Sequence, residues 1–232
     1  MMPQRHFQED LEKLKSTLVG MAGLAEDAVR SAVDALLTRD PQKAADVIKG
    51  DAELDAIEIE LEDQAINLLA LHQPMAGDLR LIAMAMKISS DLERVGDHGV
   101  NIAEGVGWLI EAAPFPVIPE IEEMVRVAID MLADSLDAFV RGDSGLARKV
   151  LKRDDRVDEL HENNFRILLT HMMEDPRKIT AGMDLLLISG NLERIADLAT
   201  NISEEVVYLV EGRIIKHHAE ERGLESQTAQ SP

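Results

Sequence analysis

The sequence predicts an all-α protein, with six long antiparallel helices arranged as two pseudo-symmetric three-helix bundles by an internal repeat. The stretch from Ile88 to Glu111 returns from Ile188 to Glu211 at a constant offset of 100, with half of the aligned positions identical. A repeat of this length indicates two equivalent parts. Apolar residues recur at the three-and-four spacing of helices, and no segment has the pattern of a strand.

The first half is expected to hold three helices. Asp40-Pro41 provides an N-cap followed by proline at the first helical position, and Gln73-Pro74 ends the helix that begins there. Long helices joined by such short loops must lie antiparallel to their neighbours. The expected helices run from about Phe7 to Leu37, from Pro41 to Leu71, and from Met75 or Asp78 to Ala112.

The second half repeats this order. The segment from Ala112 to Pro119 contains three prolines, so we interpret it as the linker and hinge between the halves. Asp143 or Ser144 is expected to cap the fifth helix, and Asp175-Pro176 the sixth. The last three helices are expected at about 121–139, 145–173 and 176–215. The predicted units are a first bundle at 1–112, a linker at 113–119, a second bundle at 120–215 and a disordered tail at 216–232.

Each copy of the repeat carries a polar stripe opposite its apolar face. At about 100° of rotation per residue, residues three and four apart gather on one side of a helix. The stripes comprise Glu93, Asp97, Asn101 and Glu104 in the first copy and Glu193, Asp197, Asn201 and Glu204 in the second. A further line on the preceding helix of each half comprises Asp51, Asp55, Glu58 and Glu62 in the first and Asp154, Asp158 and His161 in the second.

The stripes admit two interpretations. One is an ordinary solvated helix face. Against it, Glu93 and Asp97 repel each other by roughly 0.2–0.5 kcal/mol, and both copies keep this pair. Oxygen ligands of this kind suit a hard divalent cation, which would relieve the repulsion. We expect Mg, Mn, Fe or Zn at Glu93/Asp97/Asn101 and Glu193/Asp197/Asn201, assisted by Asp51, Asp55, Asp154 and Asp158, with Glu58, Glu104, Glu204 and His161 as additional candidates.

Composition limits the partners. The formal net charge is −20, which argues against nucleic acid or anionic lipid as a direct ligand and favours a protein partner with basic patches. The absence of cysteine excludes disulfides and thiolate metal sites. No signal segment and no apolar run of membrane-spanning length is present, so we expect a cytoplasmic protein without a membrane span.

The chain resembles the PhoU family in HFQEDLEKLK, in QPMAGDLR at Gln73 to Arg80, and in the paired E-x-x-x-D motifs of DLERVGD and NLERIAD. The resemblance covers nearly the whole length. It implies two three-helix bundles whose motif acids can hold metal ions. It also implies a regulatory adaptor that represses the phosphate-starvation response, acting between the ATPase subunit of a phosphate ABC transporter and a sensor histidine kinase. We also expect a homodimer, and peripheral membrane association stays open.

Two departures from the internal symmetry lead us to expect weaker metal binding in the second half. Asn191 replaces Asp91, and Phe165 stands near the position equivalent to Glu62.

Two other functions stay open. A carboxylate-bridged di-metal enzyme would need Glu-x-x-His pairs, whereas Gly96 and Ala196 stand three residues after the motif glutamates. No phosphate-binding loop or nucleophile elbow is present either, so we expect no enzymatic activity. The other alternative is a purely structural helical adaptor whose acids only provide solubility, and a metal-binding measurement separates it from the first interpretation.

Overall fold

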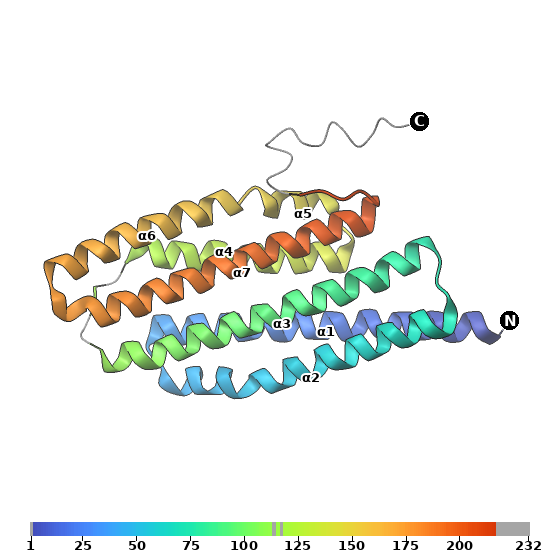
Figure 1. Cartoon of the computed structure of the whole chain (residues 1–232), viewed down its shortest axis with the longest axis horizontal. Coiled ribbons are helices and arrows are strands. Elements are labelled where there is room, and N and C mark those ends of the chain that lie inside the picture. Colours follow the sequence, from blue (N-terminus) through green and yellow to red (C-terminus); the bar gives the residue numbers. More distant parts are fainter. Residues whose placement is uncertain (1, 113–114, 117, 217–232) are drawn as a thin grey trace.

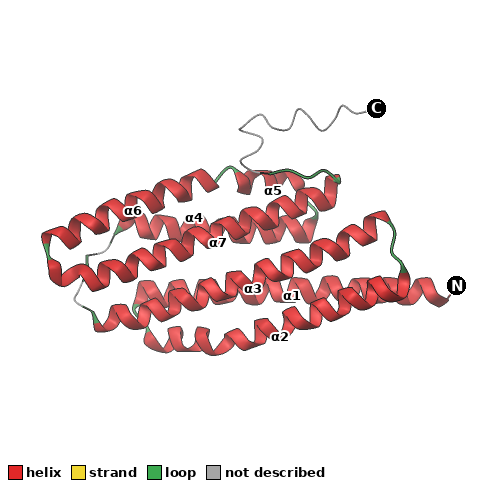
Figure 2. Ribbon diagram, viewed as in Figure 1, coloured by secondary structure: helices red, strands yellow, loops and turns green. Residues whose placement is uncertain are grey.

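The computed structural model describes residues 2–112, 115–116 and 118–216, with side chains from His6 onward, and every regular element in these ranges is helical (Figures 1 and 2). The predicted all-α class and the duplicated arrangement are confirmed. The predicted tail from 217 to 232, and positions 113, 114 and 117 of the linker, lie outside the described residues.

The first half consists of α1 (Met2–Thr38), α2 (Pro41–His72) and α3 (Ala76–Glu111). The predicted cap at Asp40 is confirmed, because its side chain accepts hydrogen bonds from the backbone N–H groups of Gln42 and Lys43 at 2.9 and 3.2 Å. Gln73 ends α2 with a left-handed backbone, at φ 48°. The first helix begins at Met2, five residues before the predicted Phe7.

The second half consists of α4 (Pro119–Arg141), α5 (Ser144–Leu151), α6 (Asp154–Glu174), a short 3₁₀ helix (Pro176–Lys178) and α7 (Ile179–Glu211). Asp143 caps α5 by accepting from the N–H of Leu146 at 2.9 Å, as predicted. Asp175 caps the 3₁₀ helix, which leads into α7. The last helix stops at Glu211 rather than Ile215, because Gly212 adopts the left-handed conformation that commonly ends helices.

The prediction of one continuous fifth helix was wrong. The helix is interrupted after Leu151 by a tightened turn in which the N–H of Arg153 donates to the carbonyl of Val150 at 2.9 Å. Such three-residue spacing is typical of a 3₁₀ turn. Beyond it the chain resumes as α6, and the guanidinium of Arg153 pairs with Asp134 of α4 at 2.6 Å.

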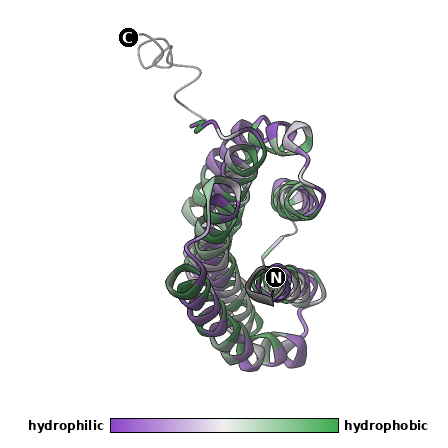
Figure 3. Cartoon of the chain, turned by 90° about the vertical axis from the view of Figure 1, so that its right-hand side faces the viewer, coloured by the Kyte–Doolittle hydropathy of each residue, from purple (hydrophilic) through white to green (hydrophobic). Residues whose placement is uncertain are grey.

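The two halves pack together along their repeat helices. Helix α1 packs on α2 and α3, α4 packs on α5, α6 and α7, and α3 lies along α7 (Figure 1). Seen from the end, α2, α3, α7 and the α5–α6 segment form one curved layer, with α1 and α4 on its concave side (Figure 3). Buried aliphatic residues of both halves form a continuous core. Movement about the Ala112–Pro119 segment would therefore have to break the contact between α3 and α7.

Candidate functional site

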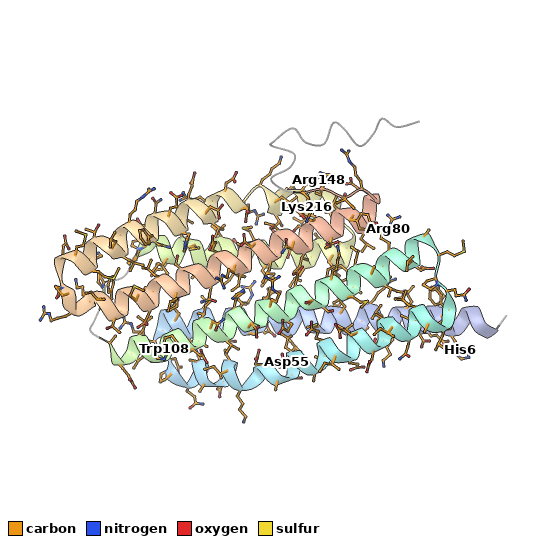
Figure 4. All side chains as sticks on the ribbon, viewed as in Figure 1. His6, Asp55, Arg80, Trp108, Arg148 and Lys216 are labelled. Carbon is orange, nitrogen blue, oxygen red and sulfur yellow. The ribbon has the colours of Figure 1, made fainter. Side chains whose placement is uncertain are left out.

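The first acidic group is formed by α2 and α3. The predicted apolar face of α3 is confirmed, since Ile88, Leu92 and Ile102 are fully buried. This anchors the opposite face at the surface, where Glu93 is half-buried and Asp97 is exposed. Asp55 of α2 lies between the two helices (Figure 4). The fold thus brings the α2 acids and the α3 motif to one surface, as the sequence predicted.

Burial and neighbouring carboxylates raise the pKa values of three acids in this group. Burial, followed by the charges of Asp97, Glu58, Asp55 and Asp51, raises the pKa of Glu93 to about 7. The pKa of Asp51 is raised by burial and then by Asp55 and Asp97.

Glu58 is affected in the same way. Burial and the charges of Glu62 and Asp55 raise its pKa, while a hydrogen bond with Ser90 opposes the shift. Carboxylates of two helices therefore lie within electrostatic reach of one another. We define Asp51, Asp55, Glu58, Glu93 and Asp97 as the first acidic group.

The carboxylates do not form a closed ligand set. Within residues 2–112, 115–116 and 118–216, no three Asp, Glu or His side chains are grouped so that they could hold a metal ion as they stand. Asn101 and Glu104 are exposed one and two turns beyond Asp97. The donor set is nevertheless the one a hard cation prefers, and half-exposed carboxylates can reorient by side-chain rotation without moving the helices.

The second acidic group is built differently. Glu193 is half-buried and Asp197 exposed on α7, while Asp154 is buried and Asp158 exposed on α6. The Nδ1 of His161 lies 3.1 Å from the hydroxyl oxygen of Ser189, to which Asn164 also donates at 3.2 Å. Phe165 is exposed at the position equivalent to Glu62. We define Asp154, Asp158, Glu193 and Asp197 as the second acidic group.

The last two members of the second stripe face another direction. Asn201 and Glu204 line a pocket of about 310 Å³ between α3 and α7, together with Asp91, Glu205 and Lys216. The ammonium group of Lys216 lies 3.4 Å from Glu204. Glu204 thus has a cation of this chain as its neighbour, and Lys216, which was assigned to the predicted disordered tail, has a defined place beside α7.

The sequence led us to expect that the difference between Asp91 and Asn191 would weaken metal binding in the second half, but the structure places both residues elsewhere, at the contact of the two halves. Burial raises the pKa of Asp91 to about 6, with Arg94 and Lys87 opposing the shift and Glu205 of α7 adding to it. Its counterpart Asn191 lies 2.9 Å from Nδ1 of His98 across the contact of the two halves. Both positions therefore lie at the α3–α7 contact, and neither belongs to the two acidic groups as defined.

Sequence reasoning missed the polar links between the halves. The ammonium group of Lys87 donates to Glu205 at 2.8 Å, and Arg80 lies over the ring of Tyr208 with 5.5 Å from its guanidinium carbon to the ring centroid (Figure 4). The cations Arg80 and Lys87 on α3 and the residues Tyr208 and Glu205 on α7 are visible in the sequence. Their pairing was not predicted, because the sequence does not say that α3 and α7 are neighbours.

The geometry defines a class of protein: a duplicated helical body that displays carboxylates of two repeats on its surface. A family model described as the PhoU domain matches residues 18–106 and again residues 121–206. The two matches coincide with the two halves of the fold. The chain therefore belongs to the PhoU family, and the predicted family resemblance is confirmed.

Individual relatives agree with this assignment. The phosphate-specific transport system accessory protein PhoU homolog of Aquifex aeolicus is 42% identical over 93% of this chain and 98% of its own length. The Caulobacter vibrioides homolog of the same name is 42% identical over 90% of this chain and 91% of its own. By their names these relatives are accessory proteins, and the family is not one of enzymes.

Solved structures have the same fold. The crystal structure of PhoU from Pseudomonas aeruginosa matches 89% of this chain and all of its own, at 37% identity and a TM-score of 0.86. The phosphate transport system regulatory protein PhoU from Streptococcus pneumoniae matches 90% of this chain and 99% of its own, at 30% identity and a TM-score of 0.82. In the described part of the chain, none of the helices has the length and apolar character needed to cross a membrane.

Proposed function

We propose that this protein is a cytoplasmic adaptor that regulates phosphate uptake and represses phosphate-starvation genes when phosphate is plentiful. It would act between the ATPase subunit of a phosphate ABC transporter and a sensor histidine kinase. The observation that carries the proposal is the pair of acidic groups displayed on the surface of a duplicated fold, in a chain whose relatives are named as accessory proteins of phosphate transport. Displayed carboxylates suit recognition of basic partner surfaces.

We also propose that the first acidic group binds a divalent metal ion. The raised pKa of Glu93 reflects repulsion and burial that a bound cation would offset. When bound, the ion would supply positive charge and open coordination positions for polar groups of a partner. Asp51, Asp55, Glu58, Glu93 and Asp97 would hold it.

The second acidic group would bind a metal ion more weakly. His161 stands where the first group has Glu58, and its ring contacts Ser189, so the second group has one carboxylate fewer. Selectivity among Mg, Mn, Fe and Zn would then depend on how many side chains can gather around the ion.

A further feature supports docking. The antiparallel helices α6 and α7 expose apolar side chains at four-residue intervals near the turn that joins them. These are Phe165, Leu169 and Met173 on α6 and Ile179, Met183 and Leu187 on α7. Exposed apolar side chains gathered in this way are typical of interaction surfaces.

A reporter assay tests the proposal. Replacing Glu93, Asp97, Glu193 and Asp197 by Ala should leave the helical content intact, because Ala is the better helix former. The variant should no longer repress a phosphate-starvation reporter in rich phosphate, and should be recovered less well with the transporter ATPase or the kinase.

A matched variant controls for the loss of four charges. It replaces Glu12, Asp63, Glu122 and Asp130, which are exposed acids outside the two acidic groups, and it should repress the reporter normally. A folded motif variant that represses as fully as this control would contradict the role given to the acidic groups.

A further inference from the structure

A pocket of about 400 Å³ opens between α1 and α2 beside α3. Its lining is mainly apolar, and Val47 and Leu54 are among its buried members. Five acids also line it: Asp27, Asp34, Asp46, Asp51 and Glu53. Lys43 is the single cation of the lining, and it already pairs with Asp34. The pocket therefore combines apolar walls with uncompensated negative charge.

The residues that line this pocket can be aligned with residues of the second repeat. Residues of α1 and α2 correspond to residues of α4, α5 and α6 at a constant offset of 103. The helix caps Asp40 and Asp143 are equivalent, as are the fully buried Ala35 and Ala138 and the buried Val47 and Val150, which fixes the register on both sides of the pocket.

At the equivalent position the second repeat has an arginine that is paired within the chain. Arg153 is the counterpart of Gly50, and its guanidinium lies 2.6 Å from a carboxylate oxygen of Asp134, the counterpart of Ser31. The neighbouring charge is also reversed, because Arg156 stands where the first repeat has Glu53, and it pairs with Glu123 at 2.6 Å.

The first repeat leaves the equivalent space open. Met131 of α4 is fully buried, whereas its counterpart Ala28 is a small lining residue of the pocket. Gly50 has no side chain, and a Cβ placed on it would meet nothing within 4 Å. The first repeat thus lacks both the buried methionine and the paired arginine that the second repeat has at these positions.

We propose that this pocket receives an arginine side chain from a partner protein, which would bring to the first repeat the guanidinium that the second repeat supplies through Arg153. The apolar walls would contact the methylene stem, and the carboxylates would accept hydrogen bonds from the guanidinium. Arginine is preferred to lysine because its planar fork can bond two oxygens at once. This inference rests on the proposed docking function for the existence of a protein partner, but not for the binding itself.

Binding is tested with the isotope-labelled full chain and the peptide Ac-Gly-Ser-Arg-Ser-Gly-NH₂, followed by amide chemical shifts. Saturable changes are expected at Ser31, Asp46 and Gly50. The same peptide with citrulline in place of arginine keeps the shape and loses the charge, so it should bind at least about tenfold more weakly. Changes confined to other surfaces, or equal binding of the citrulline peptide, would overturn the proposal.

The substitution Gly50→Arg gives the first repeat the arginine that the second already has. It should fold, because the site is open and arginine is a better helix former than glycine. It should weaken peptide binding at least about tenfold by occupying the pocket. Gly107→Arg adds the same charge at another open helical glycine, outside the pocket, and should change binding less than about twofold.

Equal weakening by the two variants would mean that net charge alone governs binding, and would overturn the proposal. The peptide assay contains no transporter, kinase or reporter gene. Its failure would therefore refute the pocket alone, whereas failure of the reporter assay would refute the proposed regulatory function alone.

Discussion

Glu93 links the charge of the first acidic group to the stability of the fold. Its pKa in the folded protein is about 7, above the ordinary value of 4.5. A carboxyl group with a raised pKa stabilises the fold fully below its unfolded pKa, and this contribution is lost as the pH rises through the folded pKa. The free energy of unfolding of the metal-free protein should therefore fall between about pH 4.5 and about pH 7. Glu93→Gln should make that fall shallower, and Asp91, whose pKa is raised to about 6, accounts for part of the fall that remains. Urea titrations across this range measure it.

Glu111→Gln, at an exposed position on the same helix, is the matched control and should keep the wild-type pH profile. Addition of Mn²⁺ or Mg²⁺ should raise stability most at the high-pH end, where Glu93 is ionised, because a ligand that binds the folded state shifts the unfolding equilibrium. An unchanged slope in Glu93→Gln would show that other groups govern the profile.

Asp184 of α7 is a buried carboxylate that lowers the stability of the folded state. Its Oδ2 atom has no hydrogen-bond partner in the described structure, and burial raises the pKa of its carboxyl group. The equivalent residue of the first repeat is Met84, which is also buried. Asp184→Met should raise the free energy of unfolding by about 1–3 kcal/mol, because it removes a desolvated polar group.

The gain should be larger at pH 8 than at pH 4, since the cost of the charged form is fully present only above the folded pKa. Asp184→Asn removes the charge and leaves a buried polar group, so it should gain less. A loss of stability in Asp184→Met would indicate that the carboxylate has a partner that stabilises it.

At the scale of the element, the sequence predicted most helix boundaries because their causes are local. The caps at Asp40 and Asp143 act on backbone groups within three residues, and this information lies in adjacent letters of the sequence. The break after Leu151 was not predictable in this way. The apolar seam continues on both sides of it from Val150 to Val157, and Arg153, whose N–H closes the tightened turn, pairs with Asp134 of another helix.

The same distinction applies to the candidate site. Helical periodicity placed Glu93 and Asp97 on one face and Asp55 on a parallel line of the preceding helix, and α2 and α3 do bring them together. Periodicity does not say which helices are neighbours across the repeat. The roles of Asn191 and Glu204 at the α3–α7 side therefore required the fold.

The caps themselves can be tested. Asp40→Ala removes the acceptor for two backbone N–H groups at the start of α2 and should lower the free energy of unfolding by about 1 kcal/mol. Asp40→Asn keeps a side-chain oxygen and should cost much less. Thermal or urea denaturation of the three proteins compares them, and equal losses in both variants would assign the effect to the charge near Lys43 rather than to the cap.

At the scale of the whole molecule, the contact between α3 and α7 unites the two repeats. Gly105 lies so close to Ile188 that an added Cβ would stand 3.0 Å from it, and the ion pair of Lys87 with Glu205 spans the same contact. A continuous core and a long shared contact predict a single cooperative unfolding transition rather than two. A metal ion or partner bound to one repeat would then stabilise both.

The protein contains one tryptophan, Trp108 of the first repeat, which makes this prediction directly measurable. Its fluorescence reports on α3, whereas far-UV circular dichroism reports on all helices, and the two urea titrations should coincide in the wild type. Gly105→Leu should overpack the contact and lower stability by about 1–3 kcal/mol, with the two probes separating if the repeats then unfold independently. Gly107→Leu, two residues away at a glycine with open surroundings, should leave the transitions coincident and nearly unshifted. Separate transitions already in the wild type would show that the repeats fold as independent units, and ligands of one acidic group could then not stabilise the other through the shared contact.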